Sequence, residues 1–88
     1  GKRAKEELWE LPLGKGFRKQ LDSQIADIKN DGINHYGASS VAAEFLHEFI
    51  DEGVKFAHLD ISGVAWNPFA PEKGVTGYGV HLLTEFIV

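Results

Sequence analysis

The stretch VKFAHLDI, from Val54 to Ile61, is apolar on both of the faces that an extended chain would present. Alternate side chains of a strand project to opposite sides of the sheet. Here Val54 and Phe56 would project to one side, and Ala57, Leu59 and Ile61 to the other. This pattern is typical of a strand in an α/β sheet that is covered on both sides. We therefore predict a strand over residues 54–61.

Two segments before this strand have apolar residues at helical spacing. In FRKQLDSQIADIKNDG, residues 17–32, the apolar stripe consists of Phe17, Leu21, Ile25 and Ile28. Asn30 and Gly32 are the stop signals that follow it. In SSVAAEFLHEFIDEG, residues 39–53, Ser39 or Ser40 can act as the N-cap and Gly53 ends the run. The sequence therefore predicts a helix in each segment.

A third helix is predicted after the strand, in TGYGVHLLTEFIV, residues 76–88, with Thr76 as its N-cap. The intervening WNPFAPEKG, residues 66–74, indicates an exposed loop. These elements give a partial α/β/α fold, with about three helices around one strand of a larger mixed sheet. One strand cannot satisfy its own backbone groups and leaves two edges open to pairing. We therefore expect residues 1–88 to be an incomplete domain that pairs with the rest of a parent protein or with copies of itself.

Composition excludes several function classes. The chain has 88 residues, no cysteine and a formal net charge of −4, which disfavours nucleic acid as a partner. Because the chain has no cysteine, it can form neither disulfides nor thiolate metal sites. The absence of cysteine suits a reducing compartment. No apolar run approaches the length of a membrane span, and the charged N-terminal GKRAKEELWE does not resemble a secretory signal. A cytoplasmic location without membrane contact is expected.

The segment HLDISG, residues 58–63, leaves its role open at this stage. On a strand His58 and Asp60 would share one side, which suits a metal site, a catalytic dyad or the polar end of a buried strand. An H-x-D pair is a weak signal, so a structural role is favoured. A zinc site from His35, His47 and His58 is disfavoured, because their spacing shows no chelating pattern.

Three segments in order carry a resemblance to a known family. They are LWELPL (8–13), FAHLDISGVAW (56–66) and KGVTGYGVHLLTEF (73–86), and together they resemble the C-terminal end of the catalytic domain of the leucyl aminopeptidases, also called cytosol aminopeptidases. The chain departs from the family pattern at three places. Tyr36 precedes the second predicted helix, Ser62 replaces the usual alanine of DIAG, and His81 stands where arginine is common.

The resemblance implies a two-metal hydrolase that removes N-terminal residues from peptides, prefers leucine and other large apolar side chains, and assembles as a hexamer. Its two divalent ions, zinc or manganese, are held by carboxylates and a lysine around the family signature Asn-Thr-Asp-Ala-Glu-Gly-Arg. That signature does not occur in this sequence. We therefore expect no catalytic residue and no metal ligand here, and no activity from this chain by itself.

The resemblance also implies a role for the residues that follow the predicted strand. By position, Ser62 and Ala65 would line the pocket for the substrate's first side chain, and Gly63 would let the backbone approach closely. His58 and Asp60 would then hydrogen-bond neighbouring groups instead of binding metal. The alternative is a non-catalytic structural or interaction protein derived from the same family.

Overall fold

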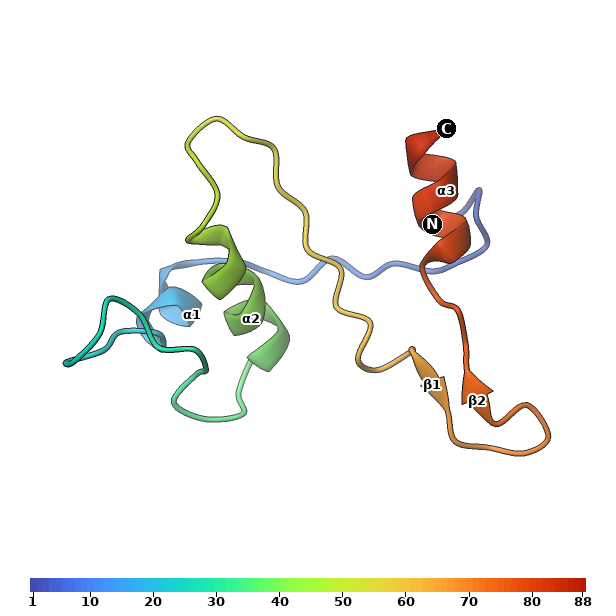
Figure 1. The fold of residues 1–88 in the computed structure, drawn as a ribbon, viewed down its shortest axis with the longest axis horizontal. Helices are drawn as coiled ribbons and strands as arrows, with labels where there is room; N and C mark the ends of the chain where they lie inside the picture. Colours follow the sequence, from blue (N-terminus) through green and yellow to red (C-terminus); the bar gives the residue numbers. More distant parts are fainter. The chain divides into compact units, whose positions relative to one another are not determined.

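The structure contains three helices and one pair of antiparallel strands, in the order α1, α2, β1, β2, α3 (Figure 1). It is a computed structural model that describes residues 1–88. The residues group into two units. We call Gly1–Trp9 with Leu59–Val88 the terminal unit, and Glu10–His58 the helical unit. The fold is mixed α/β, as expected, and the larger sheet of that expectation stays a prediction.

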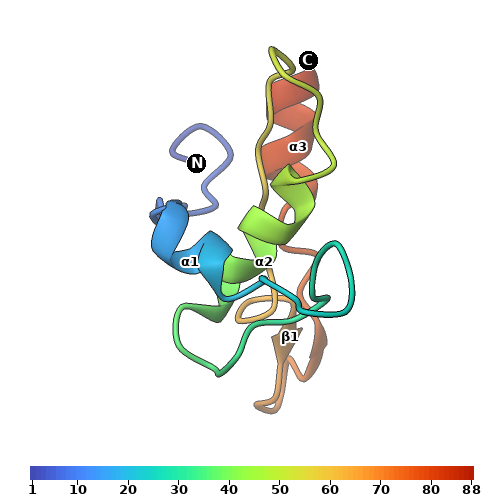
Figure 2. The ribbon, with the colours of Figure 1, turned by 90° about the vertical axis from the view of Figure 1, so that its left-hand side faces the viewer.

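The helical unit is built on the packing of α1 (Lys15–Lys19) against α2 (Ala38–His47), which Figure 2 shows beside each other. Its apolar core is small and consists of Leu21, Val41 and Ala43. The buried Glu44 accepts a hydrogen bond of 2.7 Å from the backbone N–H of Gly14, directly before α1. A carboxylate with a backbone donor therefore ties the two helices together inside this unit.

The start of α2 differs from the prediction. Gly37 precedes the helix with a φ of 62°, and neither Ser39 nor Ser40 caps it through its side chain. A Cβ added at Gly37 would lie 2.6 Å from the ring of Phe17. Glycine therefore suits this position twice, through its positive φ and through the close ring. The predicted helix itself is confirmed up to His47.

The helix predicted over residues 17–32 is wrong beyond its first three residues, because α1 ends at Lys19. The Ser23 hydroxyl accepts the backbone N–H groups of Ile25 and Ala26 at 3.3 and 3.0 Å. Such local bonds offer the backbone an alternative to the helical ladder. Ile25, a member of the predicted apolar stripe, is 98% exposed. Without a surface to bury that stripe, periodicity alone does not hold a helix.

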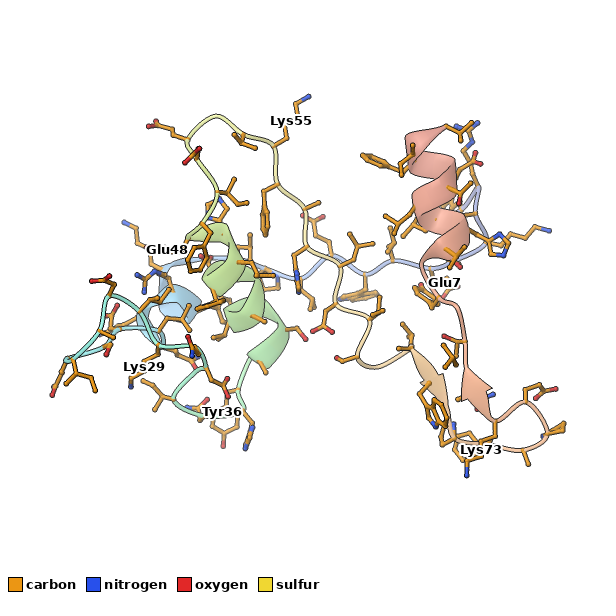
Figure 3. All side chains as sticks on the ribbon, in the orientation of Figure 1. Glu7, Lys29, Tyr36, Glu48, Lys55 and Lys73 are labelled. Carbon is orange, nitrogen blue, oxygen red and sulfur yellow. The ribbon has the colours of Figure 1, made fainter.

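The terminal unit contains the hairpin and the last helix. Strands β1 (Trp66–Asn67) and β2 (Gly74–Val75) pair antiparallel, and Trp66 stands opposite Val75. The chain between them is a loop as predicted, and Lys73, labelled in Figure 3, is its last residue. The strands at its two ends were not predicted.

Helix α3 (Val80–Ile87) confirms the third predicted helix and buries Leu82. Gly79, with a φ of 99°, precedes the helix, so the prediction of Thr76 as N-cap is wrong. Instead, one carboxylate oxygen of Glu6 accepts the N–H groups of Gly79 and Leu82 at 3.1 and 3.0 Å. No helix in the structure is both long enough and apolar enough to cross a membrane.

The strand predicted over Val54–Ile61 is wrong in this chain. These residues belong to no ladder, and Val54, Leu59 and Ile61 are 58, 38 and 41% exposed. An apolar pattern on both faces forms a strand only where neighbouring strands complete its hydrogen bonds. The only ladder of this chain lies elsewhere, between β1 and β2.

Candidate functional site

The three residues predicted to line a substrate pocket lie together in one turn, directly before β1. The carbonyl oxygen of Ile61 accepts the N–H groups of Val64 and Ala65 at 3.0 and 2.8 Å, which closes a single helical turn. Ser62, Gly63 and Ala65 belong to this Ile61–Ala65 turn. The structure thus brings all three onto one short backbone feature of the terminal unit.

Asp60 fixes the first half of the turn. Its Oδ1 accepts the backbone N–H of Ser62 at 2.9 Å and the Ser62 hydroxyl at 2.6 Å. Aspartate commonly closes a turn in this way, by bonding the backbone two residues further on. The predicted hydrogen-bonding role of Asp60 is confirmed, although the residue is not in a strand.

Thr76 fixes the second half of the turn. Its N–H donates to the Ala65 carbonyl at 3.0 Å, and its hydroxyl donates to the Val64 carbonyl at 2.6 Å. The same hydroxyl accepts the N–H of Tyr78 at 3.2 Å. Thr76 thereby extends the β1–β2 hairpin by one bond and clamps the turn onto the entry to α3. Sequence reasoning missed this role, which becomes visible only once Trp66 and Val75 are recognised as a pair.

The turn is open to solvent. Ser62 and Gly63 are exposed, and Ala65 is half-buried. A Cβ added at Gly63 would meet no atom within 4 Å. The residues offer small side chains and a free surface on a backbone that is hydrogen-bonded on both sides. Such an arrangement can contact a ligand.

The structure assembles no metal centre. No group of three or more His, Cys, Asp or Glu side chains could hold an ion. The side chains of His35, His47 and His58 therefore do not form a three-histidine site. His47 instead lies against the ring of Phe56, with ring centroids 5.3 Å apart.

One shallow hollow lies elsewhere, in the helical unit, and none of the predicted site residues lines it. Part of its wall comes from apolar side chains before and within α1, which are Leu11, Pro12 and Phe17. The rest comes from His35, from Gly37, and from the first residues of α2, which are Ala38, Ser39 and Ser40. It contains no carboxylate and no cysteine. All of its lining residues belong to the helical unit.

Comparison with known proteins gives the family. Residues 1–84 match the catalytic domain of the cytosol aminopeptidase family. A probable cytosol aminopeptidase of Ehrlichia ruminantium (strain Gardel) is 46% identical over 91 residues, which cover 99% of this chain and 18% of that protein. Proteins of the same description from Prochlorococcus marinus subsp. pastoris and Rickettsia bellii (strain OSU 85-389) are 47 and 48% identical, over 96 and 99% of this chain.

The chain spans about 18% of the length of these relatives. No solved structure matches it. The match nevertheless extends over nearly all of the 88 residues and includes the Ile61–Ala65 turn, the hairpin and most of α3. This chain belongs to the cytosol aminopeptidase family.

Proposed function

We propose that the chain is the C-terminal segment of the catalytic domain of a two-metal leucyl aminopeptidase, which removes N-terminal amino acids from peptides. The observation that carries the proposal is the match of residues 1–84 to the catalytic domain of the family. The relatives that share this segment are described as probable cytosol aminopeptidases. In this proposal the segment contributes part of the specificity pocket and part of the core.

Ser62, Gly63 and Ala65 would form the pocket wall. Their side chains are small, so together they leave room for a leucine side chain at the substrate's N-terminus. Asp60 and Thr76 hold the turn from both sides, so the wall is built on a fixed backbone. Preorganised contacts of this kind lower the cost of ordering the site when substrate binds.

Two divalent ions, zinc or manganese, would supply the chemistry of the whole enzyme by activating water and polarising the scissile carbonyl. The residues of this chain do not fit such ions, because they form no group of three or more suitable side chains. The work of this segment is to orient and select the substrate.

The remaining parts of the parent enzyme would cover the apolar surface of this segment. On α3, the side chains of Leu83, Phe86 and Ile87 are 48, 86 and 79% exposed. Exposed apolar side chains in such density mark an interaction surface. A cytoplasmic homo-oligomer, a hexamer as in the family, is part of the same proposal.

The test is the substitution Ser62→Leu in the full-length enzyme. If Ser62 faces the pocket, a leucine there crowds the substrate's first side chain. We expect kcat/KM to fall more for leucine than for alanine substrates, by about 1 to 3 kcal/mol in transition-state binding. Ser62→Ala, which restores the residue usual in the family, is the matched control and should keep the leucine preference.

Two results would count against the proposal in different ways. An unchanged preference between leucine and alanine in Ser62→Leu would mean that residue 62 does not face the substrate. Absence of any aminopeptidase turnover in the metal-loaded full-length protein would favour the non-catalytic alternative.

A further inference from the structure

Asp60 and Ser62 share a hydrogen-bond arrangement that commits the serine hydroxyl. The carboxylate oxygen Oδ1 of Asp60 accepts both the N–H of Ser62 at 2.9 Å and its hydroxyl at 2.6 Å. A serine hydroxyl has one proton to donate and two lone pairs that accept. While that proton is held by Asp60, the hydroxyl cannot donate it to another group.

The hydrogen bond from the Ser62 hydroxyl to Asp60 is of the charge-assisted kind. Hydrogen bonds from a hydroxyl to an ionised carboxylate have typical lengths of about 2.5 to 2.7 Å and are roughly twice as strong as bonds between neutral groups. The 2.6 Å separation falls in that range. The second bond, from the Ser62 backbone, keeps the carboxylate at the turn whatever the side chain at position 62. Asp60 is thus held where it can compete with a ligand for the hydroxyl proton.

We propose that Asp60 is a positioning residue for substrate selection, which makes Ser62 present only an acceptor oxygen, backed by a negative charge, to the substrate's first side chain. The inference rests on the proposed function, in which Ser62 lines the pocket. The inference goes further by naming a class of peptides that the pocket would reject. Peptides with an acidic N-terminal residue would meet an oxygen without a free proton and a carboxylate directly behind it.

Aspartate and leucine are the informative pair of substrates, because their side chains branch at the same carbon and have similar shapes. A leucine side chain makes no demand on the hydroxyl proton, whereas an aspartate side chain needs a donor. The ratio of kcat/KM for aspartyl and leucyl substrates therefore reports the state of the Ser62 hydroxyl. A general loss of structure would lower both values by the same factor.

The experiment is a double-mutant cycle in the full-length enzyme, with the variants Asp60→Ala, Ser62→Ala and the double variant. We expect Asp60→Ala to raise the aspartyl-to-leucyl ratio about tenfold, because it releases a donor and removes a charge. In the Ser62→Ala background the same change should have a clearly smaller effect. Asp60→Asn is the control, since its Oδ1 can still hold the hydroxyl proton, and it should shift the ratio less than Asp60→Ala.

Ser62→Ala alone gives a second reading that does not depend on the folding of the Asp60 variants. Because the hydroxyl proton is already committed, its removal should leave the aspartyl-to-leucyl ratio within about twofold of the wild type. A tenfold fall in that ratio would show that the substrate receives the proton, and would overturn the inference.

Two further outcomes would also overturn it. An equal effect of Asp60→Ala in both backgrounds would mean that the carboxylate acts by its charge alone, without Ser62. An equal loss for both substrates would mean that Asp60 only shapes the turn. If the wild-type enzyme hydrolyses no leucyl substrate, the proposed function itself fails, and that result is distinct from each of the others.

Discussion

Thr76 and Val64 lie twelve residues apart in the sequence and are joined by a hydrogen bond of 2.6 Å from the threonine hydroxyl to the valine carbonyl. The bond connects the Ile61–Ala65 turn to the segment that leads into α3. Together with the pairing of Trp66 and Val75, it makes the turn and the hairpin one hydrogen-bonded feature. The geometry of the candidate pocket wall therefore depends on a residue that no substrate needs to touch.

Thr76→Val should loosen this wall in the full-length enzyme. The change keeps the shape of the side chain but removes the donor to Val64 and the acceptor of the Tyr78 N–H. We expect kcat/KM for leucyl substrates to fall by about 1 to 2 kcal/mol, or roughly 5- to 30-fold. Thr76→Ser, which retains the hydroxyl, should remain close to wild type.

A matched control for this prediction lies in α3. Thr84 makes an equivalent bond, from its hydroxyl to the Val80 carbonyl at 2.7 Å. Thr84→Val removes that bond without touching the turn. Equal losses of kcat/KM in Thr76→Val and Thr84→Val would contradict the specific role of Thr76.

Glu6 should govern the stability of the first turn of α3. Its carboxylate satisfies two N–H groups at the positive end of the helix, those of Gly79 and Leu82. Glu6→Leu is expected to cost about 0.5 to 2 kcal/mol locally. Hydrogen exchange in the full-length enzyme should show this as faster exchange of the Gly79 and Leu82 amides.

The neighbouring Glu7 provides the comparison. Glu7 belongs to the same unit, and its backbone carbonyl accepts the Tyr78 hydroxyl. Glu7→Leu makes the same change of side chain but keeps that carbonyl in place. Faster exchange at Gly79 and Leu82 in Glu7→Leu as well would argue against capping by Glu6.

The ion pair between Arg18 of α1 and Glu48, the residue directly after α2, should make the helical unit sensitive to acid. Arg18 donates from Nε and Nη2 to the two carboxylate oxygens of Glu48 at 3.0 and 3.1 Å, and Figure 3 shows Glu48 at the α2 end of this pair. The hydrogen bond from Arg18 and, less strongly, its charge lower the pKa of Glu48 below the ordinary value. At a pH between the lowered folded pKa of Glu48 and its ordinary pKa, the unfolded chain therefore binds more protons than the folded chain.

The sign of the effect follows from that difference. The contribution of Glu48 is present above its ordinary pKa, near 4.5, and is lost as the pH falls through the lower folded value. The difference in protection of α2 amides between wild type and Glu48→Gln should therefore shrink from pH 7 towards pH 3. Glu52→Gln is the control at an exposed site. A difference in protection that stays constant with pH would contradict the assignment. High salt should reduce the difference in protection at neutral pH.

The 88-residue chain on its own should not behave as a stable monomer. Its buried apolar residues are only Leu21, Val41, Ala43 and Leu82, whereas large side chains such as Trp9 remain exposed. A chain of this size hides only about 60 to 65% of the surface of its unfolded form even when well packed. Light scattering combined with a denaturant melt should show association or a non-cooperative transition. A monodisperse monomer with several kcal/mol of stability would refute this expectation.

The sequence predicted the long helices well and the strands poorly, for a physical reason. Helices α2 and α3 satisfy their backbone hydrogen bonds locally, so the apolar periodicity around Val41 and Leu82 was enough to find them. Residues 54–61 have the side chains of a buried strand, but their hydrogen-bond partners would have to come from other segments. The hairpin was missed because each of its strands has two residues, too few for any periodicity.

The pocket role of Ser62, Gly63 and Ala65 stays a prediction, and only some of the hydrogen bonds around these residues could be predicted from the sequence. Ser62, Gly63 and Ala65 could be named from the resemblance of HLDISG and its flanks to a family motif. The partnership of Ser62 with Asp60 follows a local rule for aspartate in turns. The clamp by Thr76 depends on the register of a hairpin, which no pattern in the sequence specified. Contacts between residues close in the sequence could therefore be predicted, whereas contacts across the hairpin could not.

The division of the chain into units has a consequence for its synthesis. The helical unit consists of one continuous segment, Glu10–His58, and its hydrogen bonds between Gly14 and Glu44 or Arg18 and Glu48 span thirty residues. The terminal unit needs Glu6 to meet Gly79 and Leu82, which are 73 and 76 residues further along the chain. Translation proceeds at about 5 to 20 residues per second. On the ribosome, the bonds of the helical unit can therefore form before those of Glu6 with Gly79 and Leu82, because residues 10–58 are synthesised ahead of α3.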